Sequence, residues 1–137
     1  MRVVRLRPEE AHPPQNPEYF SGTVRQQRLH QTSEPGGIDM VVVFFEPAAR
    51  TRPHLHATEQ ALHVVEGEGI VATEQERWLI RTGDIVIIRA GQWHWHGATP
   101  TAAMCHISTR PVGPTNWSVP LRDWETYMLG ASAPGER

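Results

Sequence analysis

The sequence predicts an all-β fold, a β-sandwich or jelly-roll barrel with a short C-terminal helix. Short apolar runs recur at regular spacing between positions 19 and 108, and turns containing Gly or Pro separate them. This pattern is typical of an all-β sandwich or barrel. A double-sheet jelly roll of about eight strands suits it because that arrangement leaves few open sheet edges.

For the first part of the chain, the sequence predicts an N-terminal arm followed by two strands. Residues 1–17 end in a Pro-rich loop, and Pro cannot donate to a sheet ladder, so we expect an arm or an edge strand. Residues 19–25 resemble a short strand. Residues 38–46 are almost continuously apolar, which indicates a strand buried on both faces.

The middle of the chain predicts the remaining strands. They cover residues 54–65, 70–72, 77–80, 85–88 and 104–108. The Gly-rich stretch 66–69 is interpreted as a tight turn that ends the first of them. Only residues 121–129 have a helical pattern, with Asp123 as the N-cap.

The composition excludes several classes of function. The net charge of -2 and the pI of about 6.4 show no excess of basic residues of the kind that binds nucleic acid. All 13 basic residues are Arg, so no lysine can form a Schiff base with a substrate or with pyridoxal. Cys105 is the sole cysteine, and we interpret it as a buried apolar residue. No apolar run approaches membrane-spanning length, so we expect a soluble cytoplasmic protein without membrane partners.

Histidines are concentrated in the middle of the chain, where six of the 8 lie between positions 54 and 106. His54 and His56 share one face of a regular strand, and Gln60 keeps the same parity. A second strand end can bring His94 to the same point. Three imidazoles and one amide oxygen suit a divalent transition metal.

Glu59 competes with Gln60 for the fourth ligand position. A carboxylate binds divalent metals better than an amide, which favours Glu59. Strand parity favours Gln60, although a β-bulge would shift the phase by one residue. We predict Gln60 as the ligand, with Glu59 as the alternative.

Three other histidines have different predicted roles. His63 has the opposite parity and is expected to face outward. His96 shares the parity of His94 and can line the same pocket. His106 is the best candidate for a catalytic acid or base that is not a ligand, because imidazole titrates near working pH. The alternative for His106 is a hydrogen-bonded core residue.

The stretch from 46 to 94 resembles the cupin superfamily, through two motifs that occur in the expected order. The first motif is carried by His54, His56, Gln60 and Gly67. The second is carried by Gly83, Asp84, Gly91 and His94, with Arg89 or Ala90 where a Pro is expected. The resemblance implies a double-stranded β-helix over a single domain, residues 1–137. Its parts are an arm (1–17), a core (about 18–110) and a tail with a short helix (111–137).

Residues 20–107 also resemble a narrower group, the small bacterial cupins associated with carboxymuconolactone decarboxylase. This group includes manganese-dependent hydroxynitrile lyases. The segments that carry the likeness are 20–25, 45–51 and 94–106. The resemblance implies one divalent metal per chain, manganese first and Fe, Ni, Zn, Co or Cu as alternatives. It places this metal on His54, His56, Gln60 and His94.

The resemblance also implies which residues surround the metal. Those aligned with His96 and His106 line the pocket. Val41, Val43 and Arg110 face or border the pocket and are expected to influence which substrate it accepts.

Four neutral ligands leave the full charge on a divalent metal, which makes it a strong Lewis acid. We therefore predict a metal-dependent lyase for a small oxygenated substrate, acting by hydroxynitrile-lyase-like C–C cleavage or by decarboxylation. His106 and His96 are the predicted catalytic residues. Two alternatives stay open. One is an iron dioxygenase that uses O₂, although its usual carboxylate ligand is missing. The other is a cupin that binds a small molecule without catalysis.

The apolar surface predicts self-association. Residues 38–45, the Pro-rich stretch 8–17 and expected exposed aromatic residues near Trp117 and Trp124 exceed what one small barrel can hide. Cupins of this type are commonly dimers. We expect a homodimer in which the N-terminal arm crosses to the partner subunit.

Overall fold

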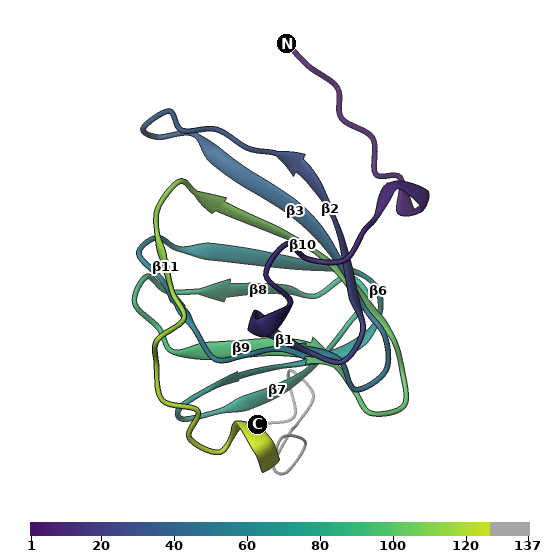
Figure 1. The fold of residues 1–137 in the computed structure, drawn as a ribbon, viewed down its shortest axis with the longest axis vertical. Helices are drawn as coiled ribbons and strands as arrows, with labels where there is room; N and C mark the ends of the chain where they lie inside the picture. Colours follow the sequence, from purple (N-terminus) through teal and green to yellow (C-terminus); the bar gives the residue numbers. More distant parts are fainter. Residues whose placement is uncertain (127–137) are drawn as a thin grey trace.

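The computed structural model describes residues 1–126, and the regular secondary structure of this part is almost entirely β strand (Figure 1). The strands are β1 (Phe20–Ser21), β2 (Val24–His30), β3 (Ile38–Phe45), β4 (Arg50–Thr51), β5 (Leu55–His56), β6 (Gln60–Thr73), β7 (Arg77–Arg81), β8 (Ile85–Ile88), β9 (His94–Ala98), β10 (Met104–Pro111) and β11 (Thr115–Asn116). Three short 3₁₀ helices accompany them, η1 (Pro8–Glu10), η2 (Pro17–Tyr19) and η3 (Trp124–Thr126). The predicted all-β jelly-roll barrel is confirmed.

The long strand β6 connects the two walls of the barrel. Its first half pairs with β8 and β10, and its second half pairs with β7 and β9. The wall on the β10 side continues through β3 to β2, and the wall on the β9 side continues through β4 to β1. Strands β5 and β11 form a separate two-stranded sheet.

The tight turn predicted at residues 66–69 is wrong, because β6 runs through this stretch without interruption. Gly67 has a φ of 85°, and a Cβ at this position would lie 2.0 Å from the carbonyl oxygen of Ala103. Glycine therefore bends the strand from one wall into the other without ending it. In the sequence alone, these glycines fit a turn that ends a strand as well as a bend within one.

Burial of β3 on both faces is confirmed only in its second half. Val42, Val43 and Phe45 are buried, whereas Ile38 is 42 % exposed. The register continues to Ile38, which pairs with Pro111 of β10. Strand pairing therefore extends beyond the packed core. An apolar run in the sequence does not show which of the paired residues are buried.

The helix predicted for residues 121–129 does not begin as expected. Arg122 and Asp123 form a turn in which Arg122 has a φ of 53°, and η3 follows. Residues 127–129 lie outside the described part. The Asp123 carboxylate pairs with Arg77 of β7. Trp124 is buried, and its indole donates to the Thr51 carbonyl at 2.9 Å. These long-range contacts accompany a turn and a short 3₁₀ helix in place of the predicted start of an α-helix.

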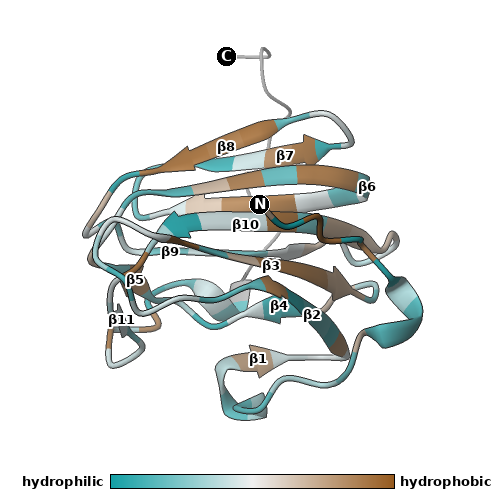
Figure 2. Cartoon of the chain, turned by 90° about the horizontal axis from the view of Figure 1, so that it is seen from above, coloured by the Kyte–Doolittle hydropathy of each residue, from teal (hydrophilic) through white to brown (hydrophobic). Residues whose placement is uncertain are grey.

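The core fills the space between the walls, and Figure 2 shows apolar residues along β3, β6, β7 and β8. Cys105 is 5 % exposed, and burial raises the pKa of its thiol to about 12. It therefore remains a neutral thiol at physiological pH, as predicted for a small apolar residue. Within residues 1–126 no helix is long and apolar enough to span a membrane. The cytoplasmic location stays a prediction.

Candidate metal centre

Three histidines converge inside the barrel. A ring nitrogen from each of His54, His56 and His94 lies within 4.8 Å of those of the other two, and all three residues are buried. His54 and His94 also exchange two backbone hydrogen bonds of 3.0 Å, so the segment before β5 is fastened to the first residue of β9. Three imidazole nitrogens at this separation can hold one metal ion.

Gln60 reaches the same cavity, but the expected strand does not carry it there. Strand β5 ends at His56, and the chain bends before β6 begins at Gln60. Gln60 is nevertheless 4 % exposed and lines the cavity, whereas Glu59 is exposed. The Gln60 amide donates to the Ser108 hydroxyl at 2.8 Å. The side-chain directions therefore favour Gln60 over Glu59, although the parity argument assumed a strand that is absent.

Hydrogen bonds orient each of the three imidazoles through its Nδ1 atom. The partners, each at 2.8 Å, are the carbonyls of Arg52 and Gln92 and the hydroxyl of Thr115, for His54, His94 and His56 respectively. A carbonyl only accepts, so Nδ1 of His54 and His94 carries the proton and Nε2 keeps its lone pair. Metal-binding histidines are typically held by such outer hydrogen bonds.

The unpaired atoms of the cluster fit a metal ion. Nε2 of His56, Nε2 of His94 and Oε1 of Gln60 are buried and have no hydrogen-bond partner among the described residues. Buried polar atoms in folded proteins are nearly always paired, so a group of unpaired acceptors lining one cavity is suited to a cation. Imidazole nitrogens and an amide oxygen are donors that transition metals accept.

His96 and His106 form a second pair beside this cluster. Nε2 of His106 and Nδ1 of His96 lie 2.9 Å apart, so one nitrogen donates to the other. Both rings are buried, and the ring centres of His96 and His94 are 5.7 Å apart. The outer nitrogens, His96 Nε2 and His106 Nδ1, have no partner within residues 1–126. The structure thus brings both predicted catalytic histidines to the cluster, while His63 is exposed as expected.

Burial lowers the pKa of all five imidazoles in the cavity. It lowers the pKa of His56 to about 3 and those of His94 and His106 to about 4. The pKa values of His54 and His96 also lie well below the ordinary value of 6.5, because burial is reinforced by the neighbouring histidines. At neutral pH the rings are therefore uncharged, as metal ligands and proton acceptors must be.

These shifts predict a specific pH dependence for the protein stripped of metal with a chelator. Histidines in the unfolded chain bind protons near pH 6.5, whereas the buried ones do so only near pH 4 or below. The unfolded state therefore binds more protons in this window, and the free energy of unfolding falls as the pH drops from 6.5 to about 4. Thermal unfolding across this range measures the effect, and His106→Gln should reduce it. A constant unfolding midpoint from pH 7 to pH 4.5 would contradict the prediction.

The cavity in front of the histidines has a volume of about 330 Å³, which suits a small ligand. Val41, Val43 and Phe45 form an apolar part of its lining, and Arg110 borders it, in agreement with the sequence-based placement. Trp117 stacks on His54 with the ring centres 4.2 Å apart. The indole therefore covers one side of the histidine cluster.

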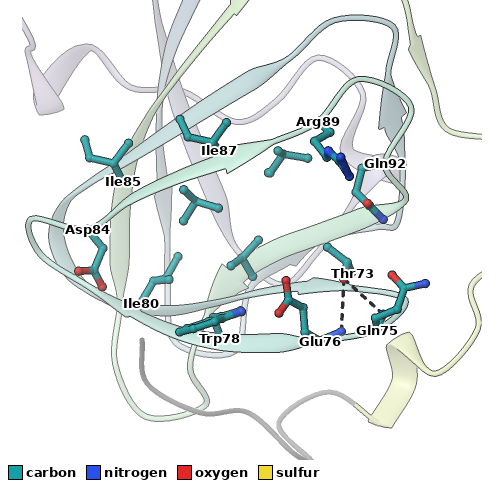
Figure 3. Close-up of a pocket in the computed structure, with 13 residues that line it drawn as sticks. Thr73, Gln75, Glu76, Trp78, Ile80, Asp84, Ile85, Ile87, Arg89 and Gln92 are labelled. Atoms are coloured by element: carbon teal, nitrogen blue, oxygen red, sulfur yellow. Dashed lines mark hydrogen bonds between the residues drawn. The ribbon is translucent and has the colours of Figure 1, made fainter. Parts of the chain in front are cut away.

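A larger hollow of about 540 Å³ lies between β7 and β8 (Figure 3). Figure 3 shows Thr73, Glu76 and Trp78 facing Arg89 and Gln92 across it. Among the described residues its lining contains no histidine or cysteine, and its carboxylates, Glu76 and Asp84, do not belong to a group that could hold a metal ion. Chemistry, rather than size, identifies the smaller cavity as the candidate functional site.

Sequence reasoning missed Thr115 and Ser108, which hold His56 and Gln60 by hydrogen bonds. Thr115 reaches His56 only because β11 pairs with β5, and 59 positions separate the two residues in the chain. The nearby Pro-rich loop offers no signal for such a contact. Ser108 has the inward parity of His106 on β10, and that pattern would have found it.

A jelly-roll barrel with three histidines converging in its interior defines the class of cupin proteins. This chain belongs to the cupin family, and the family model described as "Cupin domain" matches residues 41–108. The resemblance drawn from the motifs is therefore confirmed.

Relatives narrow the comparison. The chain is 41% identical over 95 residues to the (R)-mandelonitrile lyase of Granulicella tundricola, an alignment that covers 66% of this chain and 70% of the lyase. A cupin-like protein from Thermotoga maritima has a TM-score of 0.75 at 29% identity, covering 87% of this chain and 91% of that one. The polyketide cyclase RemF of Streptomyces resistomycificus has a TM-score of 0.71 at 16% identity, with 89% of each chain covered. The last likeness concerns the fold alone.

Proposed function

We propose that this cupin is a metal-dependent lyase that acts on a small oxygenated molecule. The observation that carries the proposal is the group of buried, unpaired acceptor atoms on His56, Gln60 and His94 beside the neutral His96–His106 pair. We assign the metal to these three residues together with His54, with manganese first and Fe, Ni, Zn, Co or Cu as alternatives. A divalent ion on four neutral ligands supplies Lewis acidity toward a substrate oxygen.

The histidine pair is proposed to move the proton. Burial keeps both rings neutral, so the outer nitrogens, His96 Nε2 and His106 Nδ1, each offer a lone pair or a proton according to tautomer. In the cleavage of a cyanohydrin, one of these nitrogens accepts the hydroxyl proton. The electrons of the C–C bond leave with cyanide, which then takes up a proton, and an aldehyde remains. The relative that is a mandelonitrile lyase supports this choice.

A substrate screen in air and under argon tests the proposal. Freshly purified protein is first analysed for metal and then given aromatic cyanohydrins such as mandelonitrile, followed by small hydroxy and keto acids. We expect cleavage that is equal in both atmospheres, is lost with a chelator and returns with the metal. Turnover that requires O₂ would favour the dioxygenase alternative. Bound metal without turnover would favour the non-catalytic alternative.

We also propose that the protein forms a homodimer. The aromatic residues Trp117 and Trp124, considered in the sequence analysis, do not support this proposal. Trp124 is 8 % exposed, and Trp117 stacks on Tyr19 and His54, so neither supplies the expected exposed surface. The exposed apolar side chains of the arm include Met1, Val3 at 74 %, Val4 at 45 % and Leu6 at 40 %. Such residues favour contact with a second copy.

The dimer proposal predicts a change of mass on altering the arm. Removal of residues 1–7, or the length-preserving double substitution V3S and L6S, should shift the protein from dimer toward monomer because the apolar contact is lost. Light scattering at micromolar concentration measures the mass, and Arg5→Ser in the same arm serves as the control. A monomeric mass for the unaltered chain would contradict the proposal.

A further inference from the structure

Strand β10 carries a row of polar side chains from the inside of the cavity to its mouth. His106, Ser108 and Arg110 alternate along the strand and line the same cavity. His106 is fully buried, Ser108 is 6 % exposed, and Arg110 is partly exposed. Residue 109 pairs with residue 61 of β6, so Arg110 lies beside the end of β6 where Gln60 begins the strand. The positively charged guanidinium of Arg110 therefore borders the proposed metal ligands.

The Arg110 guanidinium has hydrogen-bonding capacity to spare. One nitrogen, Nη1, donates to the Gly113 carbonyl at 2.8 Å. Asp39 is opposite Arg110 on β3, but no ion pair within 4.0 Å joins them in the described part, and the Asp39 carboxylate accepts from the Thr32 amide. A guanidinium has five N–H donors in a planar fork. Several donors of a partly buried cation thus remain for a ligand.

The charges of the cavity favour an anion. Apart from the histidines, its ionic residues are Arg28, Arg110 and Asp39, two positive and one negative. The histidines are neutral at pH 7, so the lining has a net positive charge before any metal ion adds to it. Arg110 lines the same cavity as His54 and His56. An anion at Arg110 therefore lies within reach of the histidine cluster.

We propose that the cavity binds a small carboxylate with an apolar body, a 2-hydroxy or 2-keto acid, and that Arg110 holds its carboxylate. The apolar body lies against Val41 and Val43, and the 2-oxygen faces the histidines. The assignment rests on the proposed metal-dependent lyase and, among the substrates of the screen, selects the small hydroxy and keto acids over the cyanohydrins, which carry no carboxylate. A guanidinium donates two parallel hydrogen bonds to the two oxygens of a carboxylate, and this bidentate pairing fixes the orientation of the ligand.

Two probes that differ only in charge test the inference. Mandelate and mandelamide share the ring and the hydroxyl, but only mandelate carries a carboxylate. Calorimetric titration of the metal-loaded, full-length protein should show mandelate binding about 10- to 100-fold more tightly, the range for hydrogen bonds to a charged group. Arg110→Gln should remove most of this preference by weakening mandelate while leaving mandelamide unchanged. Arg28→Gln, at the exposed second arginine, is the matched control and should have a smaller effect.

The outcomes separate this inference from the proposed function. Equal affinities in the unaltered protein, or an undiminished preference in Arg110→Gln with its full metal content, would overturn the role of Arg110. If Arg110→Gln does not fold, Arg110→Lys keeps the charge without the fork and must still weaken mandelate more than mandelamide. Binding is measured without turnover, so a protein inactive on every substrate still gives a result. Cyanohydrin cleavage without a carboxylate preference would overturn this inference alone.

Discussion

Replacing His56 with Ala should strip the metal from the protein. The substitution removes one of three imidazoles whose nitrogens lie within 4.8 Å of one another, and it leaves the Thr115 hydroxyl without its partner. Loss of an outer hydrogen-bonding partner alone typically costs 10–100-fold in metal affinity, so loss of the ligand itself should cost more. Elemental analysis of freshly purified protein measures the remaining metal.

The control for this experiment is His63→Ala. His63 is a histidine of β6 that is exposed and lies outside the cavity lining, so its removal should leave the metal content unchanged. Undiminished metal in the His56→Ala protein would show that the ion is held elsewhere. An equal loss in both variants would point to general destabilisation rather than to the loss of a ligand.

The second large effect is expected at His106. His106→Ala should keep its metal and lose about 10²–10⁴-fold in turnover, the usual contribution of a positioned acid or base. The substitution leaves the three clustered histidines intact and removes a fully buried ring that is hydrogen-bonded to His96. Single-turnover rates, combined with metal analysis of the same preparation, separate a chemical defect from loss of the ion.

His96→Ala identifies which nitrogen moves the proton. Full activity in His106→Ala together with inactivity in His96→Ala would transfer the role to His96. A pH–rate profile that changes in one variant and not in the other gives the same information without relying on absolute activity. Normal turnover in both variants would leave the site without a histidine base and contradict the proposed proton transfer.

Short strands between Gly and Pro turns were sufficient to predict the barrel, because each strand is a local pattern. The same local information failed at Gly67, where glycine bends β6 instead of ending it. It failed again at residues 121–126, where the pairing of Asp123 with Arg77 and the burial of Trp124 accompany a turn and a short 3₁₀ helix. Both errors concern contacts that the local pattern does not contain.

The prediction of the candidate ligands relied in part on a continuous strand from His54 to Gln60, which the structure does not contain. His54, His56 and His94 came from motif spacing, and the structure brings them together. Gln60 was chosen by strand parity, yet a bend separates it from β5, and its inward direction comes from pairing at the start of β6. The choice over Glu59 therefore depended on tertiary structure, which places one side chain in the cavity and the other in solvent.

The sequence by itself determined the chemistry that the site can offer: neutral nitrogen and amide donors, no lysine amine, one cysteine and a β scaffold. Only the tertiary structure decided which nitrogen of His54 and His94 is free, that His96 meets His106, and that Arg110 donates to the Gly113 carbonyl. Side-chain identity is a local property of the chain. Burial, pKa and hydrogen-bond partners depend on the packing of strands that are distant in sequence, and that packing exists only in the folded barrel.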